Sequence, residues 1–391
     1  FMVGVDINNM GILQKPFEWS AFPLYSFTTQ SFRGVGQIDY TFFNEKSRFV
    51  IGGDVKSFAT SDQQQNLDGL NKSDYFTRYG GKFRWDINRN SASTSNNTIQ
   101  VRQLLINQKN YLPSENRIIE GDAISNGFAT SYSNLSVTEI SYLHSVSSPR
   151  SATNFSFLAE LDKRFGALAI INGKSASLLN YSNDPVLRFN VLYKYDYSYN
   201  PHSKFYIRAY AGTAIGAKNG FSGEERNVSL TQRGANDYKF DSYFFGRNEF
   251  SGKWSQQIDE EAQGGMKIIL PNGYQNSIGK STQFIASLNT KVDVPFKLPA
   301  EFKIQPYFDI GYFASDNNYS NLQSSNLIAS GGISVSIPNY FAVYIPLYYS
   351  GGACKDDPNG LSCIMSNSTF SQRIAFSINI NKLLLDEKNK R

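Results

Sequence analysis

The sequence predicts an all-β protein, a transmembrane antiparallel β-barrel of about 16–18 strands with short periplasmic turns and long extracellular loops. Three observations predict this class. Apolar and polar residues alternate with a period of two over long stretches, the polar segments between these stretches alternate in length, and aromatic residues dominate the apolar content. Phe (30) and Tyr (24) are abundant, whereas charged residues make up only 18% of the 391 residues.

The alternation is clearest over residues 75–87. Tyr79 and Phe83 fall on one face of such a strand, and Arg78 and Lys82 on the other. The same pattern recurs over 153–165 and 187–199. Strands of about 10–13 residues are longer than the mode of about 5–6 in soluble sheets, and a tilted strand needs about 9–11 residues to cross a membrane. The length therefore favours a membrane barrel over a soluble β-sandwich or β-helix, in which these rings would pack in a core.

Further strands are expected at regular intervals. Their predicted ranges are 17–27, 33–43, 47–59, 97–106, 134–146, 204–214, 237–247, 262–270, 281–294, 301–313, 326–337, 340–350 and 371–380. The short turns include Asn44–Lys46, Asn200–Ser203 and Pro338–Asn339, and the long segments are 60–74, 107–133, 215–236, 314–325 and 351–370. Single-chain bacterial barrels have even strand counts. Counting back from a last strand that runs toward the periplasm gives 17 strands, with the first descending from the outside. This odd count predicts either one more strand upstream of Phe1 or a loop at 237–247 or 262–270.

The composition also excludes several classes of function. A net charge of +5 without a Lys/Arg block argues against a nucleic-acid partner, because phosphate binding needs clustered basic residues. No run approaches the roughly 18 apolar residues of a transmembrane helix. We expect residues 1–381 to form the outer-membrane barrel and residues 382–391 a short periplasmic tail. An export signal is expected upstream of Phe1.

The chain shows no motif for catalysis or metal binding. It holds two histidines, His144 and His202, in separate segments, and no HExxH, G-x-S-x-G or P-loop sequence. We therefore predict no catalytic residue, no metal ligand and no cofactor, and we expect this chain not to be an enzyme.

Charged residues on the polar strand faces are predicted to project into the lumen. They are Asp54, Lys56, Arg78, Lys82, Arg84, Glu160, Asp162, Arg164, Arg188, Lys194 and Asp196. Such groups either set the ion selectivity of a pore or pair with one another and fill the lumen. Both signs are interleaved, which favours pairing.

The two cysteines, Cys354 and Cys363, lie close together in the segment CKDDPNGLSC. A single close pair indicates an oxidising compartment and one disulfide in an extracellular loop. The alternative is two free thiols.

The stretch DYKFDSYFFGRNEFSGKWSQQIDEEAQGGMKI, residues 237–268, goes beyond barrel patterning. It resembles a segment in the C-terminal barrel of large outer-membrane proteins of Bacteroidota whose N-terminal part is an M1-family (gluzincin) metallopeptidase-like module. The opening FMVGVDINN, the following FEWSAFPLYSF and the closing QRIAFSININKL support the resemblance. The matching positions singled out are Asp237, Asp241, Gly246, Arg247, Gln256 and Gln257.

The resemblance implies a membrane anchor or scaffold for an upstream zinc peptidase-like module, whose catalytic residues would precede Phe1. A porin or substrate channel is the alternative, and an Omp85-type assembly barrel, which inserts other barrels, is a further one. Against the last, the nearest candidate for a VRGF-like tetrapeptide on a long loop, Asn219–Glu225, lacks that sequence. The expected partners are the outer-membrane bilayer with its lipopolysaccharide, and periplasmic or outer-membrane proteins.

Overall fold

The computed structural model describes most of the chain. The described residues are 2–11, 14–27, 31–60, 65–67, 70–72, 74–87, 94–113, 128–171, 174–177, 184–216, 227–247, 252–270, 278–296, 298–299, 302–314, 326–338, 340–350 and 370–379. They divide into two compact units, and strands β8 to β11 contribute residues to both. Unit 1 consists of residues 1–85, 100–140 and 161–185, and unit 2 of residues 86–99, 141–160 and 186–391.

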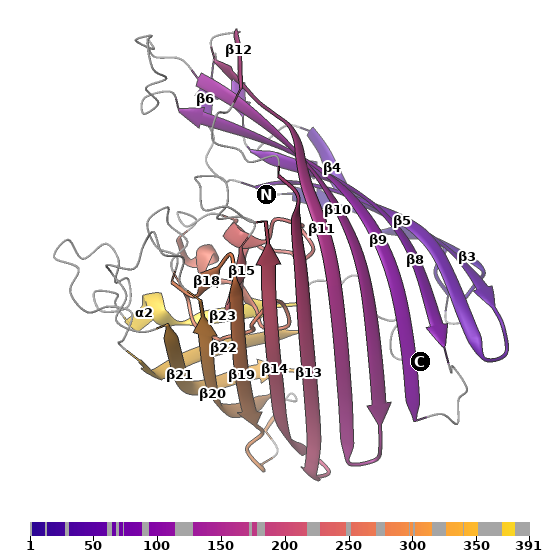
Figure 1. Ribbon diagram of the computed structural model, residues 1–391, viewed down its shortest axis with the longest axis vertical. Helices are drawn as coiled ribbons and strands as arrows, with labels where there is room; N and C mark the ends of the chain where they lie inside the picture. Colours follow the sequence, from indigo (N-terminus) through magenta and orange to yellow (C-terminus); the bar gives the residue numbers. More distant parts are fainter. Residues whose placement is uncertain are drawn as a thin grey trace. The chain divides into compact units, whose positions relative to one another are not determined.

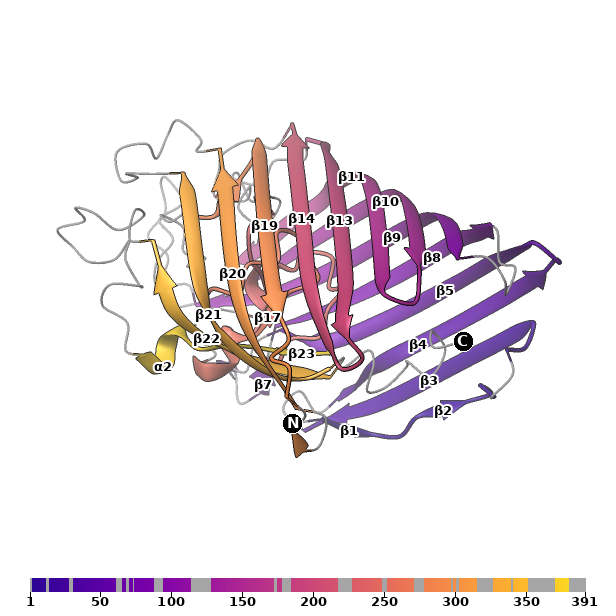
Figure 2. The same cartoon turned by 90° about the horizontal axis from the view of Figure 1, so that it is seen from below.

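The fold is built on one 17-stranded sheet, a count within the predicted range (Figures 1 and 2). Its strands are β1 (Met2–Gly4), β2 (Ile7–Asn8), β3 (Phe17–Ser26), β4 (Ser31–Phe43), β5 (Ser47–Ala59), β8 (Tyr75–Ile87), β9 (Ser95–Pro113), β10 (Phe128–Ser147), β11 (Ser151–Ile171), β12 (Lys174–Ser177), β13 (Val186–Asn200), β14 (Ser203–Ile215), β19 (Phe284–Val292), β20 (Lys303–Phe313), β21 (Leu327–Ile337), β22 (Phe341–Tyr349) and β23 (Ala375–Ile378). A separate hairpin joins β6 (Gln65–Leu67) to β7 (Leu70–Lys72).

The registers within the sheet are antiparallel. β1 and β2 both pair with β3, as two parts of one edge. β13 pairs with β14 along nearly its whole length, from Leu187↔Ile215 to Asn200↔Ser203. β14 then pairs with β19, from Phe205↔Val292 to Thr213↔Phe284, although a long segment of the chain separates them in sequence. The meander therefore continues on both sides of that segment.

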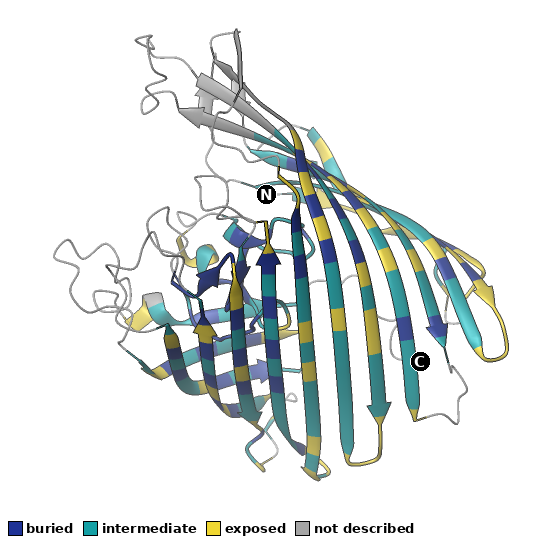
Figure 3. Ribbon diagram, in the orientation of Figure 1, coloured by how far each residue is buried: buried dark blue, intermediate teal, exposed yellow. Residues whose placement is uncertain are grey.

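Burial alternates along the strands, as Figure 3 shows. On β8, Tyr79 and Phe83 are exposed, whereas Arg78 and Asp86 are buried. On β11, Leu161 is exposed and Glu160 and Asp162 are buried. Successive side chains point to opposite faces of a strand, so each strand has an apolar outer face and a polar inner face. This is the arrangement of a membrane barrel, and the predicted fold class is confirmed.

Several strands extend beyond their predicted ranges. β9 and β10 together reach well into 107–133, which was predicted to be a loop. Polar residues such as Asn107 and Lys109 continue the ladder there. The prediction required an apolar face, but a strand outside the bilayer needs none, so it ended the strands too early. No helix among the described residues is long and apolar enough to span a membrane.

Two predicted strands, 237–247 and 262–270, are wrong, because neither range forms a membrane-spanning strand. Met266, Ile268 and Leu270 are buried in a cluster with Leu230 and Ile285, and Lys267 between them is buried as well. The apolar residues here pack inside the protein. Their alternation with polar residues therefore did not indicate a strand with a lipid-facing side.

Candidate functional site

The segment between β14 and β19 lies against the inner face of the sheet in unit 2. We call its described residues, 227–247, 252–270 and 278–282, the inward segment. Its side chains and backbone contact inner-face residues of β11, β13, β14, β19 and β20, and it also contacts β23. The contacts include Glu160, Arg188, Arg208, Lys291, Asp309 and Phe376.

The inward segment has little regular structure of its own. Two short antiparallel pairs hold it together: β15 (Val228–Ser229) with β18 (Lys280–Ser281), and β16 (Gln232–Arg233) with β17 (Ile258–Asp259). Between them lie two 3-10 turns, η3 (Gly234–Asn236) and η4 (Gly252–Gln256). Most of its backbone carbonyls therefore need partners other than a strand.

Arg233 supplies several of those partners. Its Nε and Nη2 donate to the carbonyl of Ser255 at 3.1 and 2.6 Å, and its Nη1 donates to the carbonyl of Leu270 at 2.7 Å. The side chain is only 4% exposed. The next residue, Gly234, packs so closely that a Cβ there would lie 2.0 Å from the carbonyl oxygen of Gly246. Arg233 and Gly234 thus form the centre of the segment.

The positions of the family-like motif lie around this centre. Asp237 accepts a hydrogen bond from Arg247 at 3.2 Å and others from the backbone N–H groups of Asp241 and Ser242. Arg247 also donates to the carbonyl of Ser242 at 2.6 Å. These contacts fix a loop, and none of them presents a reactive group.

The other motif positions connect the segment to the end of the chain. The amide of Gln257 bonds the backbone of Phe245 and Tyr243, both at 2.8 Å, and its main chain forms a parallel bridge with Phe376 of β23. Gln256 donates to the carbonyl of Ser371 at 3.1 Å, in the short helix α2 (Phe370–Arg373). The inward segment therefore lies beside the last strand.

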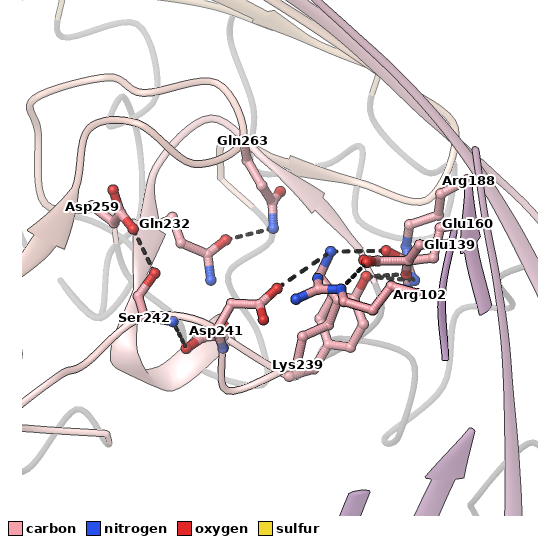
Figure 4. A network of polar contacts seen from close by, with 12 residues as sticks. Arg102, Glu139, Glu160, Arg188, Gln232, Lys239, Asp241, Ser242, Asp259 and Gln263 are labelled. Atoms are coloured by element: carbon pink, nitrogen blue, oxygen red, sulfur yellow. Dashed lines mark hydrogen bonds and ion pairs between the residues drawn. The ribbon is translucent and has the colours of Figure 1, made fainter. Parts of the chain in front are cut away.

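A buried ionic cluster joins the segment to the wall (Figure 4). The carboxylate of Glu160 on β11 accepts from Arg188 on β13 at 2.5 Å and from Lys239 at 3.0 Å. The hydroxyl of Tyr238 also donates to Glu160, and Arg188 contacts that hydroxyl at 2.8 Å. Glu160 and Arg188 are 1% and 2% exposed. We call Glu160, Arg188, Tyr238 and Lys239 the Glu160 cluster.

Further ion pairs hold the segment nearer the short turns. Glu260 pairs with Lys291 at 2.8 Å, and Lys267 with Asp309 at 2.7 Å. Glu261 pairs with Lys194 on β13. Polar groups buried in a low-dielectric interior are stable only when paired in this way. The segment is thus held by charges distributed over several strands.

Arg208 on β14 binds the segment without a carboxylate partner at ion-pair distance. It donates to the carbonyl of Glu261 at 3.2 Å, to that of Gln263, and to the side chain of Asn289 at 3.3 Å. Its Nε has no hydrogen-bond partner. Like Arg233, it satisfies carbonyl groups of an irregular backbone.

The acidic residues of the segment have shifted pKa values. The side chain of Glu261 is 60% exposed, and the charge of Lys194 and its hydrogen bond outweigh the desolvation of the carboxyl and lower the pKa of Glu261 to about 2. In the same way Lys291 and Lys267 outweigh burial and lower the pKa of Glu260. Burial raises the pKa of Asp259, partly offset by the hydrogen bond from Ser242.

The remaining predicted lumen charges lie on inner faces. In unit 1, Arg78 pairs with Asp54 at 2.5 Å and Lys82 with Asp39 at 2.8 Å. The structure buries Asp162 and Arg164, leaves Lys56 and Arg84 half-buried, and places Asp196 beside Lys194 in unit 2. Among the predicted set it therefore brings together Asp54 with Arg78 and Glu160 with Arg188.

Sequence reasoning missed Arg208, Arg233, Glu260, Glu261 and Asp309. Arg208 lies on the same face of β14 as Tyr206 and Tyr210. The two-residue alternation that identified the other lumen charges could therefore have identified it too. Arg233 carried a weaker one, the Arg-Gly dipeptide in a predicted loop. Cys354, Cys363 and the tail 382–391 lie outside the described residues, and among those described no group of three His, Cys, Asp or Glu side chains is placed to hold a metal ion.

No family model and no curated protein matches the chain. CdiB from Acinetobacter baumannii is a structural neighbour at TM-score 0.43 and 8% identity, covering 89% of this chain and 53% of that one. BamA from Haemophilus ducreyi lacking POTRA domains 1–3 follows at 0.41 and 10%, covering 90% and 67%. A Pseudomonas aeruginosa FadL homologue gives 0.32 and 8%, covering 84% and 71%. The chain spans about half the length of the CdiB structure.

The fold itself defines the class of this protein. Long antiparallel strands carry exposed apolar residues such as Leu161 and Leu288 on one face and buried charges such as Asp162 on the other. Only a surrounding of lipid makes such an outer face favourable. The chain is a β-barrel protein of the Gram-negative outer membrane, the location predicted from its sequence.

Proposed function

We propose that this chain is an Omp85-type assembly barrel, which inserts other barrels into the outer membrane. The observation that carries the proposal is the buried pair Arg233–Gly234 at the centre of the inward segment. The tetrapeptide Gln232–Ala235 shares its central Arg-Gly with the VRGF-like sequence expected on a long loop of such barrels. Gln232 and Ala235 depart from that sequence at its two ends.

The position of the inward segment supports this function over a porin. The segment lies along the inner face of unit 2, and charge pairs hold it to the strands there. A porin needs a continuous water path through its lumen. We expect the wild-type chain to show little conductance in planar bilayers, and large stepwise conductance would favour the porin instead.

A membrane anchor for an upstream peptidase-like module is the second candidate. The resemblance of residues 237–268 motivates it, and a filled interior suits an anchor as well as an assembly barrel. The two functions differ in what the cell loses. If the chain acts only as an anchor, its removal leaves the amounts of other outer-membrane barrels unchanged.

Replacing Arg233 by Ala tests the proposed function. The variant loses charge-assisted hydrogen bonds worth about 1.5–3 kcal/mol each and leaves the carbonyls of Ser255 and Leu270 without those partners. In cells whose own copy is removed, we expect wild-type protein to restore folded outer-membrane barrels and Arg233→Ala to fail. The measurement is the amount of heat-modifiable barrels in isolated outer membranes.

Arg150→Ala is the matched control, because Arg150 is exposed in a short turn. It should restore barrel levels as wild type does. Unchanged barrel levels after removal of the chain would contradict the assembly function and leave the anchor standing.

A further inference from the structure

Two adjoining chambers lie between the inward segment and the inner face of the sheet, which we call the wall. The one that reaches the short turns is called the lower chamber and the other the upper chamber. The lower chamber, of about 670 Å³, is lined by Lys194, Tyr206 and Lys291 and extends to the short turn at Pro338 and Tyr340. The upper chamber, of about 230 Å³, is lined by wall residues of β11, β13 and β14, among them Ser156, Asn190 and Tyr210. On each of these strands the lining residues of the upper chamber continue the inner-face row of the lower one.

The chambers meet at a common boundary. Arg208, Ser242 and Glu261 line both of them. These side chains are polar, so the boundary between the two chambers is polar. Lys194, which pairs with Glu261, lies on the lower side of this boundary.

Two buried atoms indicate that the upper chamber holds water. The Nε of Arg208 and the Oδ1 of Asn227 have no hydrogen-bond partner among the residues that the structure describes, and both residues line this chamber. Buried polar groups are ordinarily hydrogen-bonded to protein or to water. A chamber of about 230 Å³ has room for water.

The Glu160 cluster borders the upper chamber. Arg188, Tyr238 and Lys239 all line the chamber, and all three donate to the carboxylate of Glu160. Arg188 is the third residue of β13, at the end of that strand opposite its short turn at Asn200–Ser203. The cluster therefore lies near the end of the wall opposite the short turns.

We propose that the chambers are two sections of one passage for small hydrated inorganic ions, along the inner faces of β11, β13 and β14, and that the Glu160 cluster is its gate. The passage begins at the short turns, runs past Arg208, Ser242 and Glu261, and stops at the cluster. The gate opens when Arg188, Tyr238 and Lys239 separate from the carboxylate of Glu160. This conductance is distinct from the proposed assembly function, whose test does not depend on it.

Glu160→Gln tests the gate in planar bilayers with the full chain. The amide keeps the size of the carboxylate but not its charge, so Arg188 and Lys239 lose their shared partner. Losing one charge-assisted hydrogen bond shifts the ratio of closed to open states on the order of tenfold. We expect wild type to be closed for nearly all of the recording and Glu160→Gln to open in steps. Correct folding is checked by heat-modifiable migration.

Asp54→Asn is the matched control for the gate. Asp54 is also a carboxylate on an inner face, paired with Arg78 at 2.5 Å, and it lines neither chamber. It should leave the protein closed. Equal opening of both variants would overturn the assignment of the gate, as would a folded Glu160→Gln protein that stays closed.

A second substitution in the Glu160→Gln protein tests the path. Ser156→Trp puts a large ring into the upper chamber and should abolish the steps, whereas Ala159→Trp puts the same ring on the outer face of β11 and should not. Steps that persist with Ser156→Trp would show that ions take another route, and the proposal would be wrong.

Discussion

Arginine side chains make an irregular backbone stable inside this barrel. Arg233 and Arg208 donate to the carbonyls of Ser255, Leu270 and Glu261, which have no strand partner. A carbonyl buried at membrane depth without a hydrogen bond is costly. The guanidinium group has five N–H donors in a rigid fork and stays charged, so one side chain serves several carbonyls. Lysine at either position would serve fewer of them.

Gly234 is the residue at which close packing leaves no room for a side chain. Its missing Cβ would lie 2.0 Å from the carbonyl of Gly246 and 2.9 Å from Phe244. Gly234→Ala should therefore destabilise the protein by about 1–3 kcal/mol, the usual cost of overpacking. The measurement is urea unfolding in lipid vesicles. Gly81→Ala is the control, since no atom lies within 4 Å of its added Cβ, and equal losses would contradict the steric reason.

The acidic pair Glu260 and Glu261 makes attachment of the inward segment depend on pH. The pKa of Glu261 is lowered from 4.5 to about 2, so its stabilisation is complete above pH 4.5 and is lost as the pH falls toward 2. The lowered pKa of Glu260 acts in the same direction. The raised pKa of Asp259 acts in the opposite one, because its neutral form is favoured in the folded protein.

Acidification from pH 6 to about 2 should therefore loosen the segment. Trp254 reports this change, because its ring packs on Phe245 and Phe376 at centroid distances of 5.1 and 6.2 Å. Its fluorescence is obtained as the difference from a Trp254→Phe protein. Glu261→Gln removes one titrating group and should reduce the acid-induced change. An identical pH profile in that variant would rule out Glu261 as a contributor.

At the scale of elements, the strands owe their stability to contrasting faces. On β19, Leu288 is 44% exposed at the middle of the strand and Val292 is 38% exposed at its end. Arginine on the lipid face costs about 2–4 kcal/mol at the bilayer midplane and about 0–1 near the interface. Leu288→Arg should thus cost about 2–4 kcal/mol and Val292→Arg about 0–1, measured by reversible unfolding in vesicles. Equal costs would mean that this face does not contact lipid.

The inward segment shows where the same pattern misleads. Over 262–270, apolar and polar residues alternate much as they do in a strand, yet Lys267 is as buried as Met266 and Ile268. Lys267 is stable there because Asp309 of β20 pairs with it at 2.7 Å. That partner is far away in sequence, so local alternation gives no sign of it.

At the scale of the whole chain, the inward segment interrupts the meander without changing it. β14 and β19 pair in continuous register from Phe205↔Val292 to Thr213↔Phe284. The insertion therefore adds a filled interior to unit 2 while the wall keeps its hydrogen bonds. Loops between neighbouring strands tolerate long insertions at small entropic cost, since that cost grows only slowly with loop length.

The sequence alone determined the wall of this protein. The inner and outer faces of β8, β11 and β13 follow from the two-residue period, because lipid and water select opposite side chains at each step. Only the tertiary structure decided what fills the interior. Which carbonyl Arg233 binds, and which charges meet at Glu160, depends on residues that are distant in sequence and brought together by the fold. Such pairs leave no periodic trace, so the candidate site could not be read from the chain.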